Sequence, residues 1–149
     1  MDDDLTAAAF RRAFRDADGV EPMPLPDGEV VDSLGSDIGP LRDALTHARW
    51  LHVTEQDTGG AAATLAAWPS TGVQVDFFFG WGAPIAFDFD LRQLIGDEDV
   101  QALARFLRLV SSVVGKDVVV RPEGERDGQP ALVVEASTGR CRLLPAPPG

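Results

Sequence analysis

The sequence predicts a single α+β domain in which a mostly antiparallel sheet of about seven strands packs against one long amphipathic helix. Three observations predict this class. Apolar residues recur with a period of two in short segments after Trp50, they recur with helical spacing over residues 97–114, and the connections between strands are short. A chain of 149 residues is the size of one ordinary domain, so we expect residues 1–149 to share one core.

One or two helices are expected before the sheet. Residues 4–18 place Phe10 and Phe14 on one stripe, with acidic residues near the start and arginines nearer the end, an order that suits the helix dipole. Residues 39–48 carry a second helical stripe. Between the two, residues 20–36 contain three prolines and no sustained periodicity, so we expect an irregular crossing segment or a linker there.

Seven segments have strand-like patterns, four before the long helix and three after it, with turns rich in Gly, Pro and Ser between them. The predicted strands are 50–56, 61–68, 73–79, 85–91, 117–124, 131–137 and 140–145. The alanines of residues 61–68 leave a helix as an alternative for that segment. Residues 145–149 form a proline-rich tail.

Residues 97–114 form the clearest predicted helix. Three acidic residues crowd its start, Gly115 follows its end, and one wide face is apolar. The apolar face consists of Val100, Leu103, Phe106, Leu107, Leu109, Val110, Val113 and Val114. Because burying each large side chain contributes roughly 1.5–3 kcal/mol, we expect this helix to anchor the core.

The chain is strongly acidic. Its formal net charge of -11 repels nucleic-acid phosphates and anionic membrane surfaces at neutral pH, so we expect neither as a partner. The charge leaves basic proteins, cations and neutral ligands as natural partners, and of these we expect a basic protein. The chain opens with Met1 and three aspartates, whereas a secretory signal has a basic start followed by an apolar run. We therefore expect a cytoplasmic protein.

The sequence lacks the motifs of most recognised catalytic and metal sites. Cys141 is the single cysteine, which excludes an internal disulfide and a thiolate metal cluster, and the only imidazoles are His47 and His52. There is no HExxH, CxxC, GxSxG, Walker or GxGxxG motif. The DTG triplet at residues 57–59 fits a hairpin turn better than an aspartic-protease motif. We therefore expect no catalytic residue, no cofactor and no metal.

The segment from Val73 to Leu91 predicts an acidic surface. If residues 80–84 form the turn of an antiparallel hairpin, the numbers of facing residues sum to 164 and alternate residues lie on opposite faces. One face is wholly apolar and carries Val73, Val75, Phe77, Phe79, Ile85, Phe87, Phe89 and Leu91. The other face carries the facing pairs Gln74–Asp90, Asp76–Asp88 and Phe78–Ala86.

Facing carboxylates repel, so the charge of this second face should be offset. Three ways to offset this charge stay open. Water and neighbouring arginines could offset it on an ordinary sheet surface, a basic partner could offset it at a docking site, and a divalent ion could offset it at a metal site. Phe78 among the acids favours docking, because an apolar group rimmed by charge is typical of binding surfaces. Trp81, between glycines at the hairpin tip, either folds back over the hairpin or anchors the partner.

We therefore predict a non-enzymatic acidic binding protein that docks a basic protein partner. The predicted partner-binding residues are Asp76, Phe78, Trp81, Asp88 and Asp90. In its small size, acidity and lack of catalytic motifs the chain is similar to bacterial immunity proteins, which neutralise toxins, and to secretion chaperones, which hold a basic client. Two alternatives stay open. One is an enzyme in which the three aspartates hold Mg²⁺ or Mn²⁺ and His52 assists; the other is a subunit of a homo-oligomer.

Overall fold

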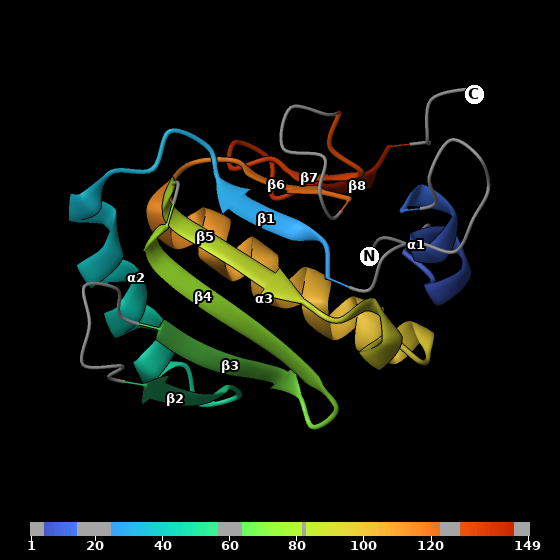
Figure 1. Ribbon diagram of the computed structural model, residues 1–149, viewed down its shortest axis with the longest axis horizontal. Coiled ribbons are helices and arrows are strands. Elements are labelled where there is room, and N and C mark those ends of the chain that lie inside the picture. The colour runs from blue at the N-terminus through green and yellow to red at the C-terminus, as the bar shows by residue number, and fades with distance from the viewer. Residues whose placement is uncertain (1–4, 15–24, 57–63, 82, 123–128, 145–149) are drawn as a thin grey trace.

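The computed structural model describes residues 5–14, 25–56, 64–81, 83–122 and 129–144. Within these ranges it has three α-helices and one eight-stranded sheet whose paired strands are all antiparallel (Figure 1). This confirms the predicted α+β class. The side chains of Gln56 and Trp81, and the predicted tail at residues 145–149, lie outside the described part of the chain.

The helices are interspersed among the strands along the chain. The helices are α1 (Ala7–Ala13), α2 (Gly35–His47) and α3 (Asp97–Val114), with a short 3-10 turn, η1 (Leu91–Gln93), before α3. The strands are β1 (Asp27–Val30), β2 (His52–Gln56), β3 (Thr64–Ser70), β4 (Val73–Trp81), β5 (Ala83–Phe89), β6 (Val118–Arg121), β7 (Leu132–Val134) and β8 (Cys141–Leu143). Across the sheet the order is β2-β3-β4-β5-β1-β6-β7-β8, so β1 alone is out of sequence order.

The long helix α3 has the predicted bounds. The acidic residues at its start cap backbone groups: Asp99 accepts a hydrogen bond from the N–H of Gly96 at 3.1 Å, and Asp97 accepts one from the N–H of Ala7 at 2.9 Å. The second bond ties the start of α1 to α3. Gly115 ends the helix with a φ of 74°, a left-handed conformation that glycine adopts without strain.

The other predicted elements are confirmed with shifted ends. The first helix begins at Ala7 and ends at Ala13, inside the predicted range 4–18, of which residues 15–18 lie outside the described residues. The second helix begins at Gly35 instead of residue 39. Residues 64–70 form a strand, which decides against the helical alternative over residues 64–68, while residues 61–63 lie outside the described residues.

The core lies between the three helices and one face of the sheet, which we call the core face. Buried side chains from all three helices form a single cluster with alternate residues of the strands. Phe77 of β4 is 0% exposed, and its ring centroid lies 5.5 Å from that of Phe87 and 5.9 Å from that of Phe106 on α3. All eight residues of the predicted apolar hairpin face are buried, which confirms that prediction.

Strand β1 corrects the prediction for residues 20–36. The structure places Asp27–Val30 as a strand between β5 and β6, near the middle of the sheet. On the core face, Gly28 lies opposite Phe87, and a Cβ built on Gly28 would come within 2.2 Å of the Phe87 ring. Only glycine leaves room for the ring at this position.

The end of β1 is held by the corner between α3 and β6. The N–H of Val31 donates to the carbonyl of Asp117 at 2.8 Å. The Lys116 ammonium donates to the Asp32 carbonyl at 2.9 Å and pairs with the Asp37 carboxylate of α2 at 2.7 Å. The hydrogen bond from Lys116 and the backbone N–H of Leu34 lower the pKa of Asp37. These contacts tie the end of β1 to the start of β6 and to α2.

No helix in the described ranges combines the length and apolarity needed to cross a membrane.

Candidate functional surface

The register of the β4–β5 hairpin matches the prediction over most of its length. Asp76 faces Asp88 and Phe78 faces Ala86, so each pair of numbers sums to 164. The strands continue further toward the tip than predicted, because Trp81 pairs with Ala83 in place of a turn over residues 80–84. The side chain of Trp81 lies outside the described part of the chain, so its role in binding stays a prediction.

The side of the sheet opposite the core face carries the predicted acidic residues, and we call it the outer face. All three helices pack on the core face, so no helix among the described residues covers the outer face (Figure 1). An antiparallel sheet tolerates one face without a packed layer, because its residues alternate between apolar and polar along each strand. Asp76, Phe78 and Asp88 are half-buried by their neighbours in the sheet.

Three carboxylates form a row across consecutive strands of the outer face. Asp76 on β4 lies directly opposite Asp88 on β5, and Asp88 lies directly opposite Asp27 on β1. Cβ atoms of directly opposite residues are about 4.5–5.5 Å apart. The side-chain amide of Gln74 donates to the Asp76 carboxylate at 2.7 Å, which orients that carboxylate along its strand. We call Asp76, Asp88 and Asp27 the acidic row.

A second row runs parallel to the acidic row, two residues further along each strand. Phe78 faces Ala86, Ala86 faces Glu29, Glu29 faces Val119, and Val119 faces Val133. We call these five residues the mixed row. Val119 is only 7% exposed, although it does not belong to the main core cluster. The guanidinium of Arg121 pairs with Glu29 at 3.0 Å, and Arg121 also lies directly opposite Asp27 at one end of the acidic row.

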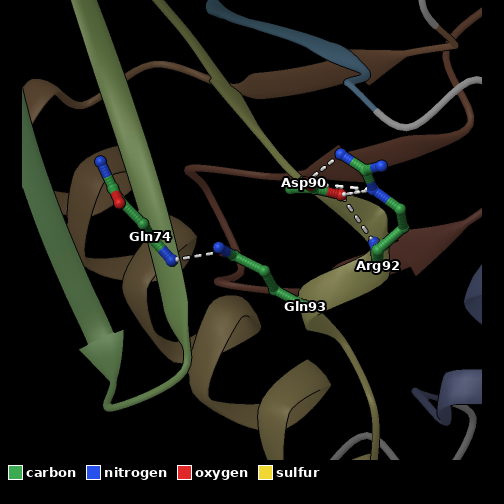
Figure 2. Close-up of polar contacts among 4 residues, drawn as sticks. All are labelled: Gln74, Asp90, Arg92 and Gln93. Atoms are coloured by element: carbon green, nitrogen blue, oxygen red, sulfur yellow. Dashed lines mark hydrogen bonds and ion pairs between the residues drawn. The ribbon is translucent and has the colours of Figure 1, made fainter.

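Asp90 does not take its predicted place in the site. The paired ladder ends at Val75 and Phe89, so Asp90 does not face Gln74, and the Gln74 N–H donates instead to the side chain of Gln93 at 2.9 Å (Figure 2). Asp90 caps η1, where its carboxylate accepts hydrogen bonds from the backbone N–H of Arg92 at 2.9 Å and from two guanidinium nitrogens of the same residue.

The contact with Arg92 changes what Asp90 can contribute. The side-chain hydrogen bond from Arg92 is the main cause that lowers the pKa of Asp90, and the same bond raises the pKa of Arg92. The negative charge of Asp90 therefore has a positive charge beside it before any partner arrives. Asp90 belongs to the edge of the surface, whereas Asp76 and Asp88 belong to its centre.

The geometry does not support the metal-enzyme alternative. Within the part of the chain that the structure describes, which includes Asp76, Asp88 and Asp90, no group of three or more His, Cys, Asp and Glu side chains is placed to hold a metal ion. His52 lies on β2, two strands away from Asp76, and its ring packs against that of Trp68 with centroids 5.1 Å apart. The predicted helper histidine and the acidic row are separate features.

The single cysteine, Cys141 at the start of β8, is buried. Cys141 is 5% exposed on the core face of β8. Loss of hydration raises the pKa of its thiol to about 11, so at neutral pH it is protonated and a poor nucleophile. This residue belongs to the core and takes no part in the outer face.

Two acidic residues of the outer face were missed by the sequence analysis. Asp27 and Glu29 were assigned to an irregular segment, and the structure places them on β1 beside β5. The signal was the alternation of polar Asp27 and Glu29 with Gly28 and Val30, too short to stand out after three prolines.

Comparison of the chain with protein-family models, with curated protein sequences and with solved structures finds no match.

Proposed function

We propose that this protein is a non-enzymatic binding protein that docks a basic protein partner on the outer face of its sheet. The observation that carries the proposal is the acidic row, in which three carboxylates stand on three consecutive strands of a face that no described helix covers. Like charges directly opposite each other destabilise a sheet. Cations from a partner would turn this repulsion into attraction, which gives the arrangement a purpose that folding alone does not.

The residues of the surface would contribute unequally. Asp76, Asp88 and Asp27 would supply the central charge, with Arg121 directly opposite Asp27 at one end of the row. Asp90 and Glu29 at the margins pair with Arg92 and Arg121. Phe78 lies directly beside the acidic row and would supply buried apolar contact. The net charge of -11 would speed the encounter with a basic partner by electrostatic steering.

The kind of protein proposed is an inhibitor or carrier of a basic client, in the manner of immunity proteins and secretion chaperones. Two features of the sequence support this class: the strong acidity and the lack of catalytic motifs. A cytoplasmic location is part of the same proposal. The homo-oligomer alternative stays a prediction, which light scattering of the purified protein would test.

The test compares two triple variants that remove the same charge from different places. One is Asp27→Asn, Asp76→Asn and Asp88→Asn, which removes the acidic row. The control is Asp32→Asn, Asp43→Asn and Glu98→Gln, three exposed acids outside that row. Basic proteins captured from native cell extract by the wild type are identified and purified, and their dissociation constants are measured by calorimetry against all three proteins at physiological salt.

Loss of the acidic row should weaken binding of the true partner about 10- to 100-fold, since close interfacial charge pairs are each worth on the order of 1 kcal/mol or more. The control variant should change the affinity by no more than about threefold, because its lost charges act only through the screened net charge. Equal weakening by both variants, or by neither, would show that the partner docks elsewhere.

A further inference from the structure

We infer that this protein forms a homodimer in which strand β2 of one copy pairs antiparallel with β2 of a second copy. The inference does not depend on the proposed function, because it concerns one edge of the sheet and not its outer face. Three observations carry it: the open backbone edge of β2, the core side chains that stay half-buried beside it, and the balance of charge around it.

The sheet ends at β2 and at β8, and these two edges differ (Figure 1). Natural sheets protect an edge with a short strand, a charged side chain or a covering helix, because unpaired N–H and C=O groups bind other strands. β8 has all three protections, since it is three residues long, has Arg142 at its middle and packs against α1. β2 is five residues long, and no described strand pairs with its other side. Its one charged side chain, Glu55, is already paired with Arg42 at 2.9 Å.

The core is incompletely covered at the same edge. Trp50, Leu51 and Val53 pack against the core cluster yet stay half-buried. By contrast, Val75 and Phe77 on the inner strand β4 are 0% exposed. Removal of apolar surface from water favours association, so a strand placed beside β2 would gain by covering these three side chains. The backbone edge and the side chains therefore point to the same position for a further strand.

The charge around β2 permits a second copy of this acidic chain. Residues 42–56 contain two arginines and two acidic residues, so their net charge is zero with both histidines neutral, whereas the whole chain carries -11. The guanidinium of Arg105 on α3 adds a positive charge 4.0 Å from the centroid of the Trp50 ring. Two copies can therefore approach at β2 without a local excess of like charge.

The sequence of β2 is complementary to itself when a twofold axis passes beside Val53. Val53 then faces Val53 of the second copy on the core face, and His52 faces Thr54 on the outer face. The flanking pair, Leu51 with Glu55, brings no like charges together. An axis beside Glu55 would set two carboxylates face to face, and an axis beside Thr54 would set Val53 opposite Glu55. The register centred on Val53 is therefore the one that we propose.

The dimer should be weak and should tighten as salt is added. A five-residue edge makes a small interface, for which we expect a dissociation constant of roughly 10–100 µM. Each chain carries -11, so salt screens the long-range repulsion between two copies and should favour the dimer. Docking of a basic partner should instead weaken with salt, because salt screens an attraction. The opposite responses separate failure of this inference from failure of the proposed function.

Cysteine cross-linking of the full chain locates the interface. Val53→Cys is a conservative change, and it sets two cysteines directly opposite each other, within the Cα separation of about 4.4–6.8 Å that a disulfide needs. Glu55→Cys is the control for register, because its two copies would lie about 13 Å apart along the strands. Arg142→Cys is the control at the other edge of the sheet. Oxidised glutathione is the oxidant, and non-reducing gels measure the rate of dimer formation; the native Cys141 is buried.

Val53→Cys should cross-link about tenfold faster than either control, although both controls are more exposed. Sedimentation velocity of the wild type should show a monomer–dimer equilibrium whose dissociation constant falls as salt is raised. Either control cross-linking as fast as Val53→Cys would overturn the inference. So would a wild type that stays monomeric at about tenfold above the expected dissociation constant, at both low and high salt.

Discussion

The two faces of one strand, β4, differ in what surrounds their side chains. Phe77 and Phe79 point to the core face and are 0% and 5% exposed, while Phe78 between them and Asp76 before them are half-buried on the outer face. The core face is packed against helices, so its residues are fixed by shape. The outer face has no helix packed on it among the described residues, and it carries the acidic row. Alternation along a strand thus gives the two faces different surroundings.

The largest effect should come from two neighbouring phenylalanines on opposite faces. Phe77→Ala should cost about 3–5 kcal/mol of unfolding free energy, because it removes a ring that packs against three others in the core. Phe78→Ala should cost about 1 kcal/mol, because that ring is half-buried at the surface. Urea denaturation of both variants measures the difference. Equal losses would mean that the outer face is as tightly packed as the core face.

A pair of glycines tests how closely the core face is packed at β1. Gly28→Ala should destabilise the protein by about 1–3 kcal/mol, since the new methyl group meets the Phe87 ring. Gly35→Ala, at the start of α2, has nothing within 4 Å of the new Cβ and should be neutral or stabilising by about 0.5 kcal/mol. Thermal melting compares the two. A neutral Gly28→Ala would show that Phe87 moves aside without loss of packing.

Glycine at position 28 also shows where prediction from the sequence fails. The long helix and the β4–β5 register follow from local patterns of 18 and 9 residues, and the structure confirms both. β1 is four residues long and includes a glycine, so its pattern is too short and too weak to outweigh the prolines before it. It is a strand because β5 and β6 pair with it on both sides and Phe87 fills the space above Gly28.

The candidate surface was predictable to the same extent as the strands that form it. Asp76, Phe78 and Asp88 lie on one strongly patterned hairpin, and their shared face follows from counting residues. Asp27 joins them only through the non-local pairing of β1 with β5, which no local pattern records. Asp90 was misplaced because β5 ends at Phe89, two residues before the predicted end at residue 91. The chain then turns into η1, where the Asp90 side chain caps the backbone.

A smaller effect is expected on the outer face, where charge and not packing is changed. Asp76→Asn keeps the oxygen that accepts from Gln74 and removes the repulsion with Asp88, so it should stabilise the protein by about 0.5 kcal/mol at low salt. The gain should fall toward zero at 1 M salt, where the screening length is about 3 Å. Asp43→Asn, an exposed acid on α2, is the control and should show little change. Destabilisation by Asp76→Asn at low salt would mean that the acidic row is compensated within the fold.

The smallest expected effect concerns the ion pair of Asp90 with Arg92 at the edge of this surface. Arg92 lowers the pKa of Asp90, so the Asp90 carboxyl holds its proton less tightly in the folded state than in the unfolded state. The stability that this provides is fully present above pH 3.8, the ordinary pKa of the group. It is lost as the pH falls through the lower pKa of Asp90 in the folded state. Arg92 is 74% exposed, so screening by water and salt keeps the contribution to stability small. In an NMR titration of the Asp90 carboxyl, Arg92→Ala should return the pKa of Asp90 to the ordinary range. In the wild type, 1 M salt should raise this pKa part of the way toward that range. If Asp90 titrates normally in the wild type, Arg92 does not neutralise it, and Asp90 then belongs with the acidic row as a fourth central charge for the partner.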